Sequence, residues 1–112
     1  MNNNVSRKIE NILAVLTKVK EGYDDTMEYI ELNELFHHAI DEVSSESRYL
    51  GDNNSTVKSN FTRKGHTLNE WLLWIFLWLN GDKSELEMHL DNERTERYAS
   101  GDYKAIKKFF AA

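Results

Sequence analysis

The chain has 112 residues, of which 40% are apolar and 29% charged, and its 14 basic and 19 acidic residues give a formal charge of −5. The absence of cysteine excludes disulfide bonds, a thiol nucleophile and metal centres with cysteine ligands. No apolar run approaches the ~20 residues that a membrane-spanning helix needs, and the first residues lack the basic and apolar regions of a signal peptide. We therefore expect one cytoplasmic domain over residues 1–112.

The spacing of the apolar residues predicts an all-α protein. Proline is absent, and the glycines fall where helices would end. Over 5–20, and again over 26–49, apolar residues recur every three or four positions, which is typical of amphipathic helices. Asp25 and Glu28 have the spacing of a capping box at the start of the second helix. Residues 51–66 are rich in turn-forming side chains and are predicted to form the longest loop.

Three more helices are predicted in the second half of the chain. Thr67 and Glu70 form a capping box ahead of a helix over 68–80 that is apolar on every side. A helix over 84–99 carries few apolar residues, and a short helix over 102–111 follows it. We expect a compact bundle of about five helices. Since a helix that is apolar all round must be covered, we place the tryptophan-rich helix at its centre.

The three tryptophans, Trp71, Trp74 and Trp78, lie along one side of helix 68–80. In one interpretation the other helices bury them. In the other, aliphatic residues alone fill the core and the indoles form a homodimer interface, since tryptophan is enriched at the centres of such contacts. Binding to a membrane surface is not expected, because this helix has no lysine or arginine.

The acidic charge is concentrated in residues 21–46, which hold nine acidic residues and no basic one. Like charges three or four positions apart oppose helix formation by about 0.2–0.5 kcal/mol per pair. Either basic residues of the first and last helices or solvent offset this charge, or it forms a surface that attracts a basic partner. The second interpretation predicts six partner-binding residues: Asp25, Glu28, Glu31, Glu34, Asp41 and Glu42.

The sequence motifs give little support for a metal site or for enzymatic activity. Glu34 and His37, with His38 beside them, have the Glu-x-x-His spacing of helical metal sites. Those sites need a second such motif, and neither His66 nor His89 has a glutamate three residues before it. Neither a nucleophile elbow nor a phosphate-binding glycine loop is present. We therefore expect no catalysis, no cofactor and no bound metal.

The leading hypothesis from the sequence is a non-enzymatic acidic module that binds another protein. An inhibitor, immunity or anti-defence factor of a phage or other mobile element, acting on a basic nucleic-acid-binding protein, would fit this description. Direct nucleic-acid binding is not expected, because the basic groups at 63–64 and 104–108 are small and the chain is acidic. The alternatives are an assembly subunit that dimerises through the tryptophan helix and a carboxylate–histidine metal-binding protein.

Overall fold

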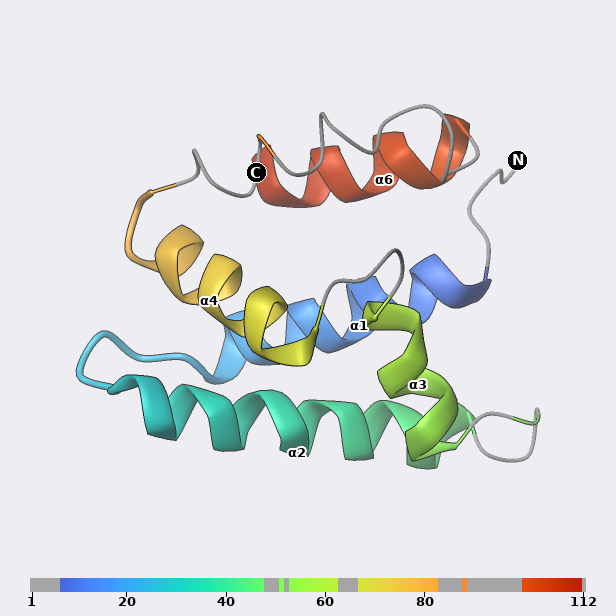
Figure 1. The fold of residues 1–112 in the computed structure, drawn as a ribbon, viewed down its shortest axis with the longest axis horizontal. Coiled ribbons are helices and arrows are strands. Elements are labelled where there is room, and N and C mark those ends of the chain that lie inside the picture. Colours follow the sequence, from blue (N-terminus) through green and yellow to red (C-terminus); the bar gives the residue numbers. More distant parts are fainter. Residues whose placement is uncertain are drawn as a thin grey trace.

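The computed structural model describes residues 7–47, 51, 53–62, 67–82, 88 and 100–111. Figure 1 shows the helices, and no strand occurs among these residues. The all-α prediction is therefore confirmed. The helices are α1 (Arg7–Gly22), α2 (Tyr29–Ser47), α3 (Asn54–Phe61), α4 (Leu68–Leu79) and α6 (Ser100–Ala111). The predicted helix over 84–99 lies outside the described residues, apart from Met88.

The start of α2 differs from the prediction by three residues. The Asp24 carboxylate accepts hydrogen bonds from the backbone N–H, at 2.8 Å, and the hydroxyl of Thr26, and this closes a turn ahead of the helix. The helix begins at Tyr29, and the carboxylate of Glu31 accepts a 2.9 Å hydrogen bond from the backbone N–H of Glu28. Glu31 therefore caps the helix at Glu28, and the predicted pairing of Asp25 with Glu28 is replaced by a turn.

The predicted loop over 51–66 contains the helix α3, so that prediction is wrong in part. The side chain of Asn53 accepts a 3.0 Å hydrogen bond from the backbone N–H of Thr56 and caps this helix. The apolar residues Val57 and Phe61, four positions apart, are both fully buried. Asparagine, serine and threonine favour turns and helix N-caps for the same reason, a short side chain that bonds to nearby backbone N–H groups. The composition of residues 51–66 therefore does not distinguish a loop from a capped helix.

The capping box predicted for the tryptophan helix is present. The backbone N–H of Glu70 donates to the Thr67 hydroxyl at 3.1 Å, and the backbone N–H of Thr67 donates to the Glu70 carboxylate at 2.7 Å. The helix ends at Leu79, and Gly81 follows with a positive φ of 95°. This left-handed conformation is open to glycine without a steric penalty, and it turns the chain away from the helix axis.

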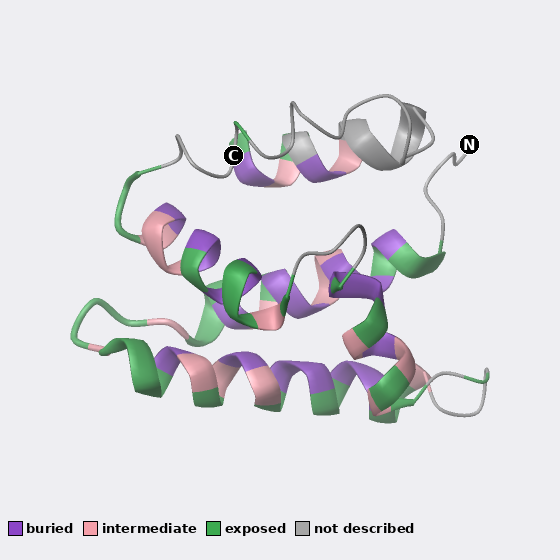
Figure 2. Ribbon diagram, in the orientation of Figure 1, coloured by how far each residue is buried: buried purple, intermediate pink, exposed green. Residues whose placement is uncertain are grey.

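The hydrophobic core lies between the helices, and α1 occupies its middle. In Figure 1, α2 and α6 lie on opposite sides of α1, and α1 contacts α2, α3 and α6. The tryptophan helix α4 is not enclosed on every side, because Leu73 is exposed. Figure 2 shows exposed segments along α4. The predicted position of α4 at the centre of the bundle is therefore not confirmed by the described residues. The fully buried core residues of α1 are Ile9, Ile12, Val15, Leu16 and Val19.

Candidate protein-binding surface

The six acidic residues predicted to bind a partner are all exposed. Asp25 and Glu28 lie in the turn before α2, and the others lie along the helix itself. We call these six residues the acidic surface. Because an α-helix turns by about 100° per residue, they do not form one straight row. They therefore meet different neighbours, which decides how much of their charge is available.

Asp41 and Glu42 are adjacent in the sequence but contact different neighbours of α2. The Asp41 carboxylate accepts a hydrogen bond from the side-chain amide of Asn54 in α3. The Glu42 carboxylate lies instead beside Lys18 of α1. The C-terminal half of α2 thus uses its acidic side chains to contact α1 and α3.

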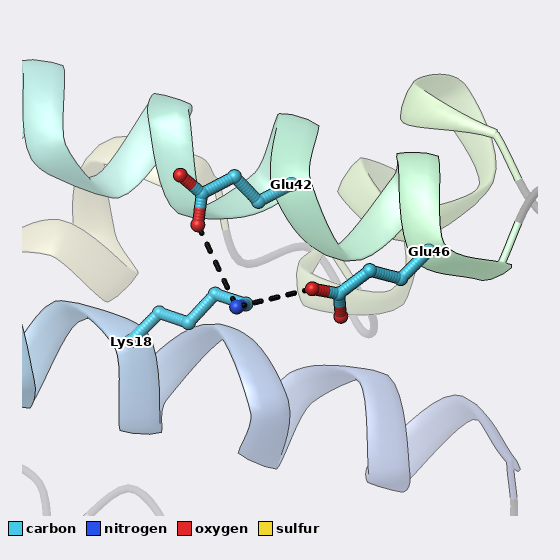
Figure 3. A network of polar contacts seen from close by, with 3 residues as sticks. All are labelled: Lys18, Glu42 and Glu46. Carbon is cyan, nitrogen blue, oxygen red and sulfur yellow. Dashed lines mark ion pairs between the residues drawn. The ribbon is translucent and has the colours of Figure 1, made fainter.

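Lys18 forms the ion pairs that the sequence could only suggest. Its Nζ lies 3.5 Å from the Glu42 carboxylate and 3.3 Å from the Glu46 carboxylate (Figure 3). The hydrogen bond and charge of Glu46, followed by the charge of Glu42, raise the pKa of Lys18 above its ordinary value of 10.5. One cation therefore offsets part of the charge of two carboxylates. Glu42 is the residue of the acidic surface whose charge is most directly reduced.

The N-terminal half of the acidic surface has no such cation among the described residues. Within the part of the chain that the structure describes, no ion pair reaches Asp25, Glu28, Glu31 or Glu34. Glu28 and Glu31 have a structural role, because acidic groups at a helix N-terminus are favoured by the helix dipole and Glu31 also caps the helix. Asp25 and Glu34 have no comparable role in starting the helix. Both residues are exposed.

Glu34 also lines an open pocket of about 430 Å³ on the outer side of α2. The other residues around it include Asn33, His37, His38 and Asp41. This places the predicted Glu34–His37 pair beside a second imidazole and a second carboxylate. Among the described residues, however, no group of three or more such side chains is arranged to hold a metal ion.

The tryptophans proposed as a dimer interface lie inside the chain. The exposed fractions of Trp71, Trp74 and Trp78 are 3%, 4% and 7%. Trp71 packs edge-on against Phe61 and Trp74. The ring of Trp78 packs against Phe109 and Phe110 of α6, and its Nε1 donates a 3.2 Å hydrogen bond to the carbonyl of Phe110. The dimer alternative required exposed indoles, and all three are buried. A dimer contact through them would have to open this core.

Sequence patterns did not predict the apolar residues that are exposed near the contact between α2 and α4. Tyr29 and Phe76 pack edge to face with 5.6 Å between their ring centroids. Tyr29, Ile30 and Leu73 are 41%, 66% and 45% exposed. Ile30 does not fit the three- and four-residue spacing of Leu32, Phe36 and Ile40, which is a signal present in the sequence. Leu73 gave none, because every side of its helix is apolar.

Comparison of the chain with protein-family models, curated proteins and solved structures found no match. Among the described residues, no helix combines the length and apolar character needed to cross a bilayer. The assignment of function therefore depends on the chemistry of this chain's own surface.

Proposed function

We propose that this protein acts by binding a basic protein through the N-terminal half of its acidic surface, and that it catalyses no reaction. The observation that carries the proposal is the exposure of Asp25 and Glu34 without an ion pair among the described residues. The carboxylates of Glu28 and Glu31 add negative charge between them. A concentrated charge of one sign speeds the encounter with an oppositely charged surface and disfavours wrong partners.

The partner class follows from this charge. A protein that binds nucleic acid presents lysine and arginine at the positions where phosphates lie. Acidic side chains on a rigid helix would compete for that surface, whereas they would repel nucleic acid itself. An inhibitor, immunity or anti-defence factor of a mobile element is the kind of protein that would use such a contact, and a cytoplasmic location would suit it.

The alternatives receive less support from the geometry. A dimer through the tryptophans lacks exposed indoles, since all three are buried. A metal-binding role lacks a set of three ligands among the residues described here. The acidic surface is therefore the best-supported binding feature of the chain.

The test is capture of a partner from cell lysate with variants that leave the start of α2 intact. Glu34→Lys, and Asp25→Lys combined with Glu34→Lys, reverse charge without touching the cap between Glu28 and Glu31. Glu10→Lys is the matched control for Glu34→Lys, because it makes the same change in net charge at an exposed position of α1. Circular dichroism establishes that each variant is folded.

The proposal predicts that the wild type and Glu10→Lys recover the same basic protein. Recovery should fall with Glu34→Lys and fall further in the double variant. Equal recovery by all four proteins would overturn the proposal, and so would an equal loss with Glu10→Lys and Glu34→Lys, because only net charge would then matter.

A further inference from the structure

The apolar patch at the junction of α2 and α4 adds a second element to the candidate surface. We define it as Tyr29, Ile30, Leu73 and Phe76. The edge-to-face contact between Tyr29 and Phe76 joins the two helices, and Leu73 lies three positions before Phe76 on the same side of α4. Ile30 follows Tyr29 in the first turn of α2. Single exposed apolar residues are ordinary, but here Tyr29 makes the contact between the two helices, and the exposed Ile30 and Leu73 each lie within one helical turn of a residue in that contact.

Acidic side chains flank the patch within the part of the chain that the structure describes. Neither α2 nor α4 contains a lysine or an arginine. Asp25 and Glu28 precede Tyr29, and Glu34 lies one helical turn after Ile30. The patch is thus an apolar centre with an acidic rim. Protein interfaces commonly combine an apolar centre with a polar rim, and the central residues supply most of the binding energy.

We propose that the apolar patch binds an amphipathic segment of the basic partner, with apolar side chains against Ile30 and Leu73 and lysine or arginine toward the acidic rim. This inference rests on the proposed function and specifies the contact that the partner makes. A second copy of this chain fits poorly, because a symmetric contact would bring the two acidic rims together. An anionic lipid surface is disfavoured by the same repulsion.

The experiment uses two labelled synthetic peptides of about 18 residues, a length sufficient for helix formation on a surface. Both contain the same leucines and lysines. In the amphipathic peptide the leucines recur every three or four positions, and in the scrambled peptide they are spread around the helix. A third peptide keeps the amphipathic pattern but has glutamate in place of lysine. Fluorescence anisotropy gives the dissociation constant of each peptide.

The protein variants separate apolar contact from charge. Ile30→Ser combined with Leu73→Ser removes apolar area at exposed positions, so the fold should persist. Ile30→Leu combined with Leu73→Met is the matched control, because it keeps the apolar area. Asp25→Lys combined with Glu34→Lys changes the charge of the rim alone.

The proposal predicts that the wild type binds the amphipathic peptide at least about tenfold more tightly than the scrambled one, as expected for loss of one central apolar contact. This preference should disappear in the double serine variant and persist in the control variant. Sedimentation at the same concentrations should give the mass of one chain.

Four results would overturn this inference. Equal binding of both basic peptides, weakened by the rim variant, would leave the proposed function standing but remove the patch from it. Equally tight binding of the glutamate peptide would remove the requirement for a basic partner segment. Self-association that the double serine variant abolishes would assign the patch to a second copy. If neither basic peptide binds, the inference also fails, and the capture experiment decides the proposed function separately.

Discussion

The ring of Tyr29 in the first turn of α2 packs edge to face on Phe76 of α4, with an interplanar angle of 86°. Through this contact the acidic end of α2 is held against the tryptophan helix, whose other side is buried in the core. The candidate binding surface therefore has a rigid support. A charged side chain on a fixed helix loses less conformational entropy on binding than one on a free loop.

Replacing Tyr29 tests this support. Tyr29→Ala should lower the free energy of unfolding by about 1–2 kcal/mol, because it removes the aromatic contact and a half-exposed ring. Tyr29→Phe keeps the ring and should stay close to the wild type. Urea denaturation followed by circular dichroism measures both. Equal stability of the alanine and phenylalanine variants would show that the contact does not fix α2.

The N-cap of α3 gives a prediction about the helix that replaced an expected loop. Asn53→Ala removes the acceptor for the backbone N–H of Thr56 and should cost about 1 kcal/mol. Asn53→Asp keeps an acceptor at the same place and should cost much less. Thermal unfolding compares the two variants. A loss of the same size for both would mean that the cap does not stabilise α3.

Two of the tryptophans differ in their hydrogen bonding. The Nε1 of Trp78 donates to the carbonyl of Phe110, whereas the buried Nε1 of Trp71 has no hydrogen-bond partner among the residues that the structure describes. Both indoles are buried to a similar extent. Trp78→Phe should therefore destabilise the protein by about 1 kcal/mol more than Trp71→Phe, the typical value of one hydrogen bond. Denaturant titration of the two variants tests this order, and the reverse order would contradict it.

The ion pairs of Lys18 predict a change of stability in alkaline solution. A lysine with a raised pKa in the folded state stabilises the protein below its ordinary value of 10.5, and this stabilisation is lost as the pH rises through the folded-state pKa. The wild type should therefore melt at a slightly higher temperature than Lys18→Met at pH 9, and the difference should vanish well above pH 10.5. A difference that is independent of pH would indicate that packing of the lysine stem, not its charge, is responsible.

Sequence patterns predicted the positions of the helices better than the contacts between them. The capping box of Thr67 and Glu70 identified the start of α4, because its hydrogen bonds are local. The same local reasoning failed at Asn53, where cap and turn use the same side-chain chemistry. Periodicity also indicated most of the buried positions of α1, although the polar Asn11 is buried among them.

The candidate surface depended on contacts between helices, which periodicity does not supply. The acidic run was visible in the sequence, but the pairing of Lys18 with Glu42 required the relative rotation of α1 and α2. The apolar pattern of α4 required that it be covered, yet it did not say which side would stay exposed at Leu73. Each of these features follows from how the helices pack.

The most direct test of the account is the affinity of the captured partner for the wild type and for the Asp25→Lys, Glu34→Lys double variant, measured by titration calorimetry at low and high salt. We expect the double variant to bind at least about tenfold more weakly at low salt, and the difference to shrink as salt screens the charges. Equal affinity of the two proteins at low salt would contradict the claim that these carboxylates form the binding surface.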